Sequence, residues 1–304
     1  RLSCPALEFP IQSQEKAMSR FFIALAVLFG CAAGAAPLDL KTPEGQIAAL
    51  RRIQCSEVDG KPVTYYWKGV AYSRVPGEPD RLLFKVEGMN IRHCGPLATA
   101  KSKVDFRLVT REILLYEDPA TGEVLKTWSN PWTGKTLEVI QVANDPVNGN
   151  YSVVGRDGKP TNLPFEVIGK QWWLSTPVPL FYTNPLGGDY QQYVGGMYHA
   201  TELFNFFGDI DDLNNRKRDT AQAAVSWQRL SSWLPWMEMG DRAGMLYFHT
   251  AGRKLDKWDE LSATMKAEID RNYPEYRNPP PLDDQRPNET SWTYFKRKID
   301  ARRP

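Results

Sequence analysis

Two charged side chains in apolar surroundings are the residues of this sequence best placed to do chemistry. In the β-rich run Met197–Phe206, alternation places Glu202 on a face that is otherwise apolar. That face also carries Tyr198, Ala200, Phe204 and Phe206. Arg229 shares a face with Trp227 in a neighbouring β-rich run, and a guanidinium pairs well with a partly buried carboxylate. The pair predicts either the polar end of an apolar pocket, where it orients a ligand or acts as acid and base, or a buried ion pair that locks two strands.

Histidine supplies the other candidate base. The three histidines are His93, His199 and His249, and His199 lies on the opposite face of its strand from Glu202. Separations of 106 and 50 positions give no sign that the three side chains meet, as a metal site would require. The sequence also lacks a P-loop, a dinucleotide fingerprint, a Gly-x-Ser-x-Gly elbow and a His-Glu-x-x-His motif. We therefore predict neither a metal ion nor a cofactor.

The segment Trp233–Gly240 is dense in large apolar side chains, with two tryptophans and two methionines in eight positions. These four residues are Trp233, Trp236, Met237 and Met239. Aromatic and thioether groups together make a soft, adaptable apolar surface of the kind that ligand sites use. Pro235 interrupts regular structure here. The segment is predicted either to line a pocket or to plug one end of the core.

Cysteine use indicates one cross-link. Cys55 and Cys94 lie 39 positions apart. The other two cysteines, Cys4 and Cys31, fall in segments that we expect to be absent from the mature protein. In an oxidising compartment the remaining pair predicts a disulfide, and closing a loop of this length would stabilise the fold by about 4 kcal/mol. Two buried free thiols are the alternative.

Residues 18–35 have the character of an export signal. Arg20 follows Met18, the apolar run Phe21–Phe29 has nine residues, and Ala33-Gly34-Ala35 is a small-residue cleavage signature. We expect cleavage after Ala35 and a periplasmic or secreted protein. The apolar run is too short to cross ~30 Å of hydrocarbon, so no transmembrane span is expected in the mature chain. An uncleaved anchor and a lipoprotein modified at Cys31 are the alternatives, and residues 1–17 are interpreted as an upstream or non-native leader.

Most of the remaining chain consists of β-rich runs separated by Gly, Pro, Asn and Asp. The expected strands are Val63–Arg74, Arg81–Cys94, Val104–Tyr116, Glu123–Trp128, Lys135–Val142, Tyr151–Val154, Phe165–Trp173, Leu180–Thr183, Met197–Phe206, Ala223–Leu230 and Met245–Thr250. Short turns without alternating helices favour an antiparallel meander, and closure into a barrel would remove its exposed edges. The predicted fold class is mainly β, with an antiparallel β-barrel-like, calycin-like domain.

Helical spacing occurs at both ends of this domain. Thr42 and Pro43 begin a short amphipathic helix that continues to Ile53, and Lys257–Asn272 forms a second one near the C-terminus. We assign residues 36–281 to a single domain and residues 282–304 to a polar, basic tail.

Composition excludes several classes of protein. The 304 residues are 42% hydrophobic and 24% charged, which is ordinary for a globular protein and excludes disorder as the main state. The net charge of +2 is too small for a typical nucleic-acid binder, so no such partner is expected.

Three motifs lie close together in the second half of the chain, namely Tyr198–Phe204, Ser226–Arg229 and Trp233–Gly240. Together they resemble the uncharacterised bacterial family called domain of unknown function 1838, with the Trp-Leu-Pro-Trp-Met-x-Met-Gly run as the specific part. The resemblance covers roughly residues 46–281 and implies an exported or soluble β-rich domain. The family brings no established activity, so the resemblance assigns no catalytic residue.

The function expected first is binding of a small, largely apolar or aromatic molecule inside the barrel. Its predicted contacts are Tyr198, Phe204, Trp227, Arg229, Trp233, Trp236, Met237 and Met239. A cofactor-free isomerase, cyclase or hydrolase with Glu202 or His199 as base is the second hypothesis. The third is a structural or partner-binding envelope protein with a filled barrel. Neither the ligand nor the oligomeric state follows from the sequence.

Overall fold

The computed structural model describes residues 36–183, 193 and 197–302. The predicted leader and export signal, with Cys4 and Cys31, lie outside these residues. Helix α1 (Pro43–Gln54) begins as its sequence predicts, because the Thr42 side chain accepts a hydrogen bond from the Gly45 amide and Pro43 occupies the first turn. Its apolar side packs into the core of the β-sheet described next.

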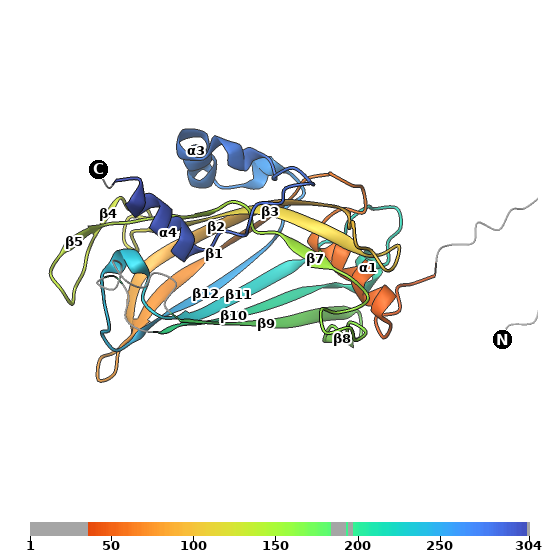
Figure 1. Ribbon diagram of the computed structural model, residues 1–304, viewed down its shortest axis with the longest axis horizontal. Helices are drawn as coiled ribbons and strands as arrows, with labels where there is room; N and C mark the ends of the chain where they lie inside the picture. The colour runs from red at the N-terminus through yellow and green to blue at the C-terminus, as the bar shows by residue number, and fades with distance from the viewer. Residues whose placement is uncertain (1–35, 184–192, 194–196, 303–304) are drawn as a thin grey trace, which may run out of the picture. The chain divides into compact units, whose positions relative to one another are not determined.

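Ten strands form one antiparallel sheet, and the prediction of a mainly β, antiparallel fold is confirmed (Figure 1). They are β1 (Val63–Arg74), β2 (Arg81–Pro96), β3 (Phe106–Glu117), β6 (Val142–Asn144), β7 (Gly149–Tyr151), β8 (Phe165–Ile168), β9 (Gln171–Thr183), β10 (Met197–Asp209), β11 (Ala224–Ser231) and β12 (Met245–Lys254). A separate hairpin pairs β4 (Thr127–Ser129) with β5 (Thr136–Glu138). Helix α2 (Ile210–Leu213) is a single turn after β10.

The sheet consists of two meanders that meet along one seam. Its strand order is β6-β3-β2-β1-β12-β11-β10-β9-β8, with β7 paired to β3. β1 and β12 therefore pair in the middle of the sheet, from Tyr65 opposite Lys254 to Arg74 opposite Met245. One meander extends on either side of this seam.

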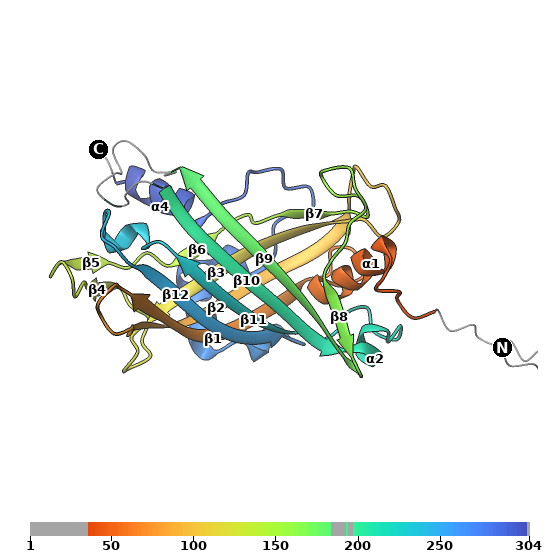
Figure 2. The same cartoon turned by 90° about the horizontal axis from the view of Figure 1, so that it is seen from below.

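The expected closed barrel is wrong, because the described strands form an open sheet. β6 and β7 end one side and β8 ends the other, and no described strand pairs these two edges. The edge strands have only three or four residues each, which is one way to limit edge-to-edge pairing without closure. The sheet is nevertheless curved, and Figure 2 shows β9 and β10 passing in front of β3 and β6. One face is therefore concave, and we call it the inner face.

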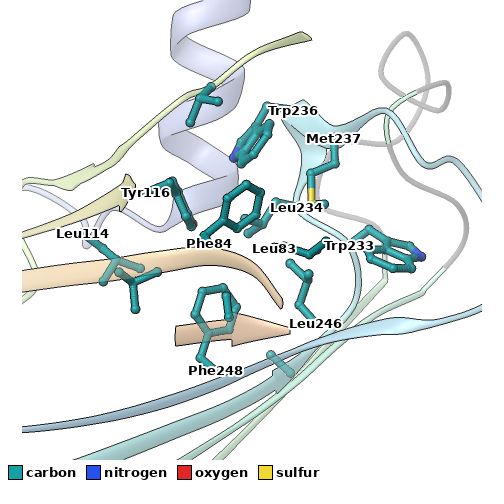
Figure 3. Packing of buried hydrophobic residues seen from close by; sticks show 14 of the residues in the cluster. Leu83, Phe84, Leu114, Tyr116, Trp233, Leu234, Trp236, Met237, Leu246 and Phe248 are labelled. Atoms are coloured by element: carbon teal, nitrogen blue, oxygen red, sulfur yellow. The ribbon is translucent and has the colours of Figure 1, made fainter. Parts of the chain in front are cut away.

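The inner face carries two apolar clusters, one toward each end of the strands. One cluster is built around α1 and includes Ile47, Ile53 and Phe106. The other contains Phe84, Tyr116 and Trp236, and Figure 3 shows these side chains pointing toward one another. The Phe84 ring lies 5.8 Å from the Trp236 ring and 5.4 Å from the Tyr116 ring. Aromatic side chains of this kind supply much of the buried apolar area.

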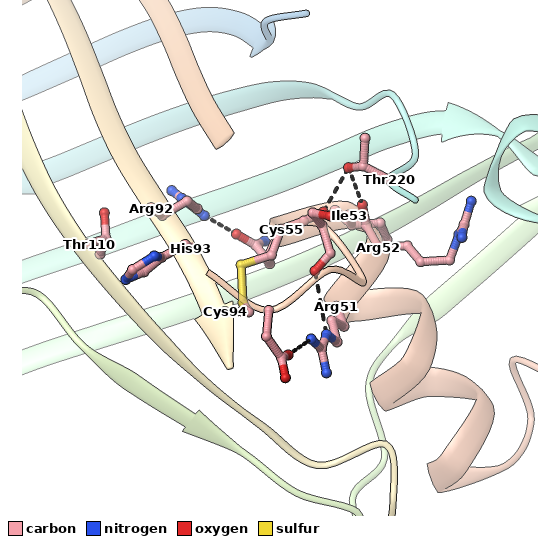
Figure 4. The surroundings of a disulfide bond; sticks show 12 residues. Arg51, Arg52, Ile53, Cys55, Arg92, His93, Cys94, Thr110 and Thr220 are labelled. Carbon is pink, nitrogen blue, oxygen red and sulfur yellow. Dashed lines mark hydrogen bonds and ion pairs between the residues drawn. A yellow bond between two sulfur atoms is a disulfide. The ribbon is translucent and has the colours of Figure 1, made fainter. Parts of the chain in front are cut away.

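A disulfide joins Cys55, at the C-terminal end of α1, to Cys94 of β2, as predicted (Figure 4). Both residues are fully buried. The bond thus ties α1 to the inner face at one end of the sheet.

The outer face is partly covered by α3 (Ala263–Asn272), which follows a 3-10 turn, η3 (Trp258–Glu260). The predicted helix over residues 257–272 is therefore split, and Ser262 caps α3 by accepting a hydrogen bond from the Met265 amide. Met265 and Ile269 pack against Met89 and Ile113 of β2 and β3. A further turn, η4 (Pro274–Arg277), follows α3.

The segment expected as a polar tail contains an ordered helix, α4 (Ser291–Asp300). Thr290 and Thr293 form a capping box at its start. Trp292 and Phe295 are buried in the inner-face cluster that contains Trp236. α4 is thus part of the folded domain, and the domain reaches beyond the predicted limit at residue 281.

No helix in the described part of the chain is long and apolar enough to span a membrane.

Candidate functional site

A cavity of about 240 Å³ lies over the middle of the inner face. Its wall includes Leu114 of β3, Val142 of β6 and Leu180 of β9, so the two halves of the curved sheet both contribute. The first residues of α4, from Ser291 to Trp292, line the same space. The cavity is therefore bounded by both meanders and by the start of the C-terminal helix, and it is partly open.

Aromatic rings form much of the wall. They belong to Tyr65, Trp67, Phe204, Phe206, Trp227 and Trp292. Trp67 lies flat against β2 because residue 88 is glycine; a Cβ atom there would come within 2.2 Å of the indole. Trp227 lies 6.5 Å from both Trp67 and Phe204, measured between ring centroids. Such a wall suits an apolar or aromatic group.

The pair predicted from the sequence lines this cavity. Glu202 and Arg229 lie directly opposite each other on β10 and β11. Arg229 Nη1 lies 3.1 Å from Glu202 Oε1, and the two side chains are 12% and 18% exposed, respectively. The cavity wall thus contains one ion pair, Glu202–Arg229, in which the two charges compensate each other. Phe204 and Trp227 line the cavity beside it.

A second set of polar residues, missed by the sequence reasoning, comes from the other meander. Asn90, Glu112 and Asn144 stand side by side on β2, β3 and β6. Asn144 Nδ2 donates a hydrogen bond of 2.8 Å to Glu112 Oε1. All three residues line the cavity, and we call them the polar row.

The pKa of the Glu112 carboxyl is raised, mainly because burial disfavours the charged form. The hydrogen bond from Asn144 acts against this shift, and the Glu202 carboxylate adds to it. Arg92 and Arg229 both lower the pKa. Charges from both meanders thus act on one carboxyl group. The polar row and the Glu202–Arg229 pair line the same cavity from different meanders.

Arg92 is the other missed residue. It lies on the inner face of β2, lines the cavity and is only 9% exposed. Its Nε donates a hydrogen bond of 3.0 Å to Asn90 Oδ1, and its Nη1 donates one to Gln54 Oε1 at the end of α1. The guanidinium lies over the Tyr65 ring, 4.8 Å from the centroid. Figure 4 shows Arg92 pointing toward the end of α1 that the disulfide holds.

The same alternation that singled out Glu202 would have found these residues. On β3 the inward positions run Phe106, Leu108, Thr110, Glu112, Leu114 and Tyr116, with one carboxylate among them. On β2 Arg92 follows Asn90 at the same spacing. The signal was therefore present, but it required knowing which face of each strand is concave.

Several predicted site residues lie elsewhere. His199 is exposed on the outer face, so it cannot act as a base in this cavity. Trp233, Trp236, Met237 and Met239 are buried in the end cluster and do not line the cavity. The segment around η2 (Pro235–Met237) is thus a plug at one end of the core, the second of its two predicted roles. The side chain of Tyr198 lies outside the described residues.

The other two histidines also lie away from the cavity. Both ring nitrogens of His93 lie within hydrogen-bond distance of backbone carbonyls, 3.1 Å from Gly60 O and 2.7 Å from Pro280 O. His249 is exposed on β12. Within the described ranges, no three His, Cys, Asp or Glu side chains gather as a set of metal ligands.

Comparison with protein families places residues 60–299 in the family described as "Protein of unknown function (DUF1838)". The match covers most of the chain, so the protein belongs to this family, as the three sequence motifs predicted. A comparison with curated proteins found no match.

Proposed function

We propose that the protein binds a small, largely apolar or aromatic molecule in the inner-face cavity. The observation that carries the proposal is a partly enclosed space with aromatic walls and a few convergent polar groups, which is the usual composition of a ligand site. Calycin-like barrels hold one small ligand inside a single curved sheet in a comparable way. Here an open sheet and α4 would together enclose the ligand.

The cavity size restricts the ligand. A volume of about 240 Å³ is slightly below the ~300–1,000 Å³ typical of drug-sized ligands. Benzene occupies apolar cavities of ~150 Å³ in proteins. We therefore propose a ligand with one aromatic ring, or an aliphatic molecule of similar size.

A cofactor-free enzyme is the second candidate function. It is favoured by Glu112, because a partly buried carboxyl with a raised pKa inside a cavity is a suitable general acid or base. An isomerase, cyclase or hydrolase would use it in this way. Glu112→Gln would then abolish turnover of a bound substrate while leaving its binding largely unchanged.

We also propose that the protein acts in the cell envelope after export. The signal-like residues 18–35 and the Cys55–Cys94 disulfide support this location. Intact-mass analysis of the envelope fraction tests it, since the chain should begin at Ala36; retention of Met18 or a lipid on Cys31 would contradict it.

Filling the cavity tests the binding proposal. Toluene, benzyl alcohol and benzoate are the probes, and quenching of tryptophan fluorescence or ligand-observed NMR measures their binding. Val225 lies on the cavity wall and is 6% exposed. Val225→Phe should weaken binding of the best probe by at least about tenfold, because the larger side chain occupies the space of the ring.

Val70→Phe is the matched control, since Val70 lies on the outer face of the neighbouring meander. It should leave probe affinity within about twofold of wild type. If no probe binds, or if both variants behave alike, the cavity is not a ligand site and a structural or partner-binding role becomes the better hypothesis.

A further inference from the structure

Arg92 and Arg229 are the two arginines that line the cavity, and they differ in their partners. Arg92 has no carboxylate paired with it among the described residues. In the described part of the chain, it forms no ion pair, and its two hydrogen bonds run to the side-chain amides of Asn90 and Gln54. Its second amino group, Nη2, donates to none of the described residues. Arg229, by contrast, lies against the Glu202 carboxylate.

Burial of this cation is unfavourable in the ligand-free protein. Burial lowers the pKa of Arg92, while the surrounding Tyr65, Tyr151 and Glu112 raise it only in part. Amide oxygens compensate a buried guanidinium incompletely, because they carry partial rather than full negative charge. Glu112 is the carboxyl group that acts on Arg92, but it is hydrogen-bonded to Asn144 and its own pKa is raised.

The surroundings of Arg92 suit a ligand anion better than a further protein carboxylate. The N-terminal end of the ten-residue helix α4 lines the same cavity, and the macrodipole makes such an end favourable for negative charge. The Tyr65 ring holds the guanidinium from one side. A guanidinium matches the geometry of a planar carboxylate, as it does that of a phosphate, and can bind it through two parallel hydrogen bonds.

We propose that the ligand is a small aromatic or apolar carboxylate, and that Arg92 binds its carboxylate group. This inference rests on the proposed function, since it names the chemical class of the molecule that occupies the cavity. A monoanion is favoured over a phosphate dianion because only one cation in the described part of the cavity lacks a counter-charge. The aromatic rings of Phe204 and Trp227 would pack against the rest of the ligand.

A pair of probes with the same ring tests the proposal. Benzoate and benzyl alcohol are compared by calorimetric titration at neutral pH, with phenyl phosphate as a third probe. Wild-type protein should prefer benzoate over benzyl alcohol by at least about tenfold. In Arg92→Met the preference should fall below about twofold, mainly through weaker benzoate binding. Arg253→Met is the control, because Arg253 is exposed on the outer face of β12 and paired with Glu260; it should keep the wild-type preference.

The outcomes separate this inference from the proposed function. Equal binding of benzoate and benzyl alcohol to wild type would overturn the carboxylate assignment and leave the binding function standing. Stronger binding of phenyl phosphate would overturn it in favour of a phosphate. If none of the three probes binds, the proposed function fails first and the inference falls with it. Should Arg92→Met fail to fold, the wild-type comparison of the three probes still decides the ligand class.

Discussion

On the inner face Glu112 lies in a cavity near Arg92, whereas on the outer face Glu87 and Glu117 lie where α3 meets the sheet. Glu87 is completely buried, yet protein groups surround it. Tyr66 Oη donates a hydrogen bond of 2.9 Å to Glu87 Oε1, and Lys68 Nζ lies 3.0 Å from Oε2. Ser262, the N-cap of α3, also donates to Oε1.

Both regions contain a carboxyl with a raised pKa. Burial, followed by hydrogen bonding and repulsion between the two carboxyl groups, raises the pKa of Glu117 to about 7. On this criterion alone the outer face would look like the better candidate for catalysis. What distinguishes the inner face is that its polar groups line a space large enough for a molecule. A perturbed pKa therefore marks a functional site only together with access.

The largest effect is expected from removing the disulfide, which joins α1 to the inner face and has no counterpart on the outer face among the described residues. Changing Cys55 and Cys94 together to serine should lower the free energy of unfolding by about 4 kcal/mol, because the 39-residue separation closes a long loop in the unfolded chain. Urea denaturation measures this loss. Probe binding should weaken as well, since Gln54 and Arg92 lie next to the bond. A loss below about 1 kcal/mol would show that α1 holds the inner face without the bond.

A smaller effect is expected from the Glu202–Arg229 pair. Arg229→Met should lower the free energy of unfolding by about 2 kcal/mol, less than for a fully buried pair because both side chains retain some exposure. Adding Glu202→Gln should restore much of that loss, since no uncompensated carboxylate then remains. A thermal-melt cycle on the four proteins gives the coupling. Additive effects would mean that the Glu202–Arg229 contact contributes little to stability. The description of these two residues as an ion pair in the cavity wall would then be wrong.

The smallest effect concerns the outer face and appears as a pH dependence. The pKa of Glu117 is higher in the folded protein, about 7 against an ordinary 4.5, so the folded state holds its proton more tightly. The associated stability is complete below about pH 4.5 and is lost as the pH rises to about 7. Glu117→Gln should remove about 1 kcal/mol of this decline, after allowance for solvent screening.

Urea titrations at several pH values measure the slope. Exposed Glu123→Gln is the control and should keep the wild-type slope. Probe binding in the cavity should not change in Glu117→Gln. If it does change, the two faces are coupled, and the contrast between an accessible site and a structural cluster no longer holds.

Much of the fold was predictable because strand alternation is a strong local signal. The run Val63–Arg74 was predicted with the bounds that β1 has. Closure was predicted wrongly, because local alternation does not reveal how far a sheet curves or what covers its edges. α4 was missed although Trp292, Phe295 and Ile299 have helical spacing, since the many charged residues around them suggested a tail.

The candidate site was only partly predictable for a related reason. Glu202 and Arg229 lie on strands that are consecutive in the chain, and such strands commonly pair, so the contact could be predicted. Glu112 and Arg92 belong to the other meander, and the sequence does not say that this meander faces Glu202 across a cavity. Trp233 and Trp236 carried the most conspicuous motif, but apolar density does not separate a pocket wall from a packed core.

The seam between β1 and β12 gives any occupant of the cavity a mechanical role. Strands from early and late in the chain meet there, and the space above them is bounded on one side by Glu112 and on the other by Glu202. A molecule held there would act as a noncovalent cross-link between the two leaves, in addition to the line of backbone hydrogen bonds between β1 and β12 and the two apolar clusters that both leaves share. Its binding free energy would add to the free energy needed to separate β1 from β12. The N-terminal and C-terminal leaves would then unfold as one unit when the cavity is occupied, and with less cooperativity when it is not.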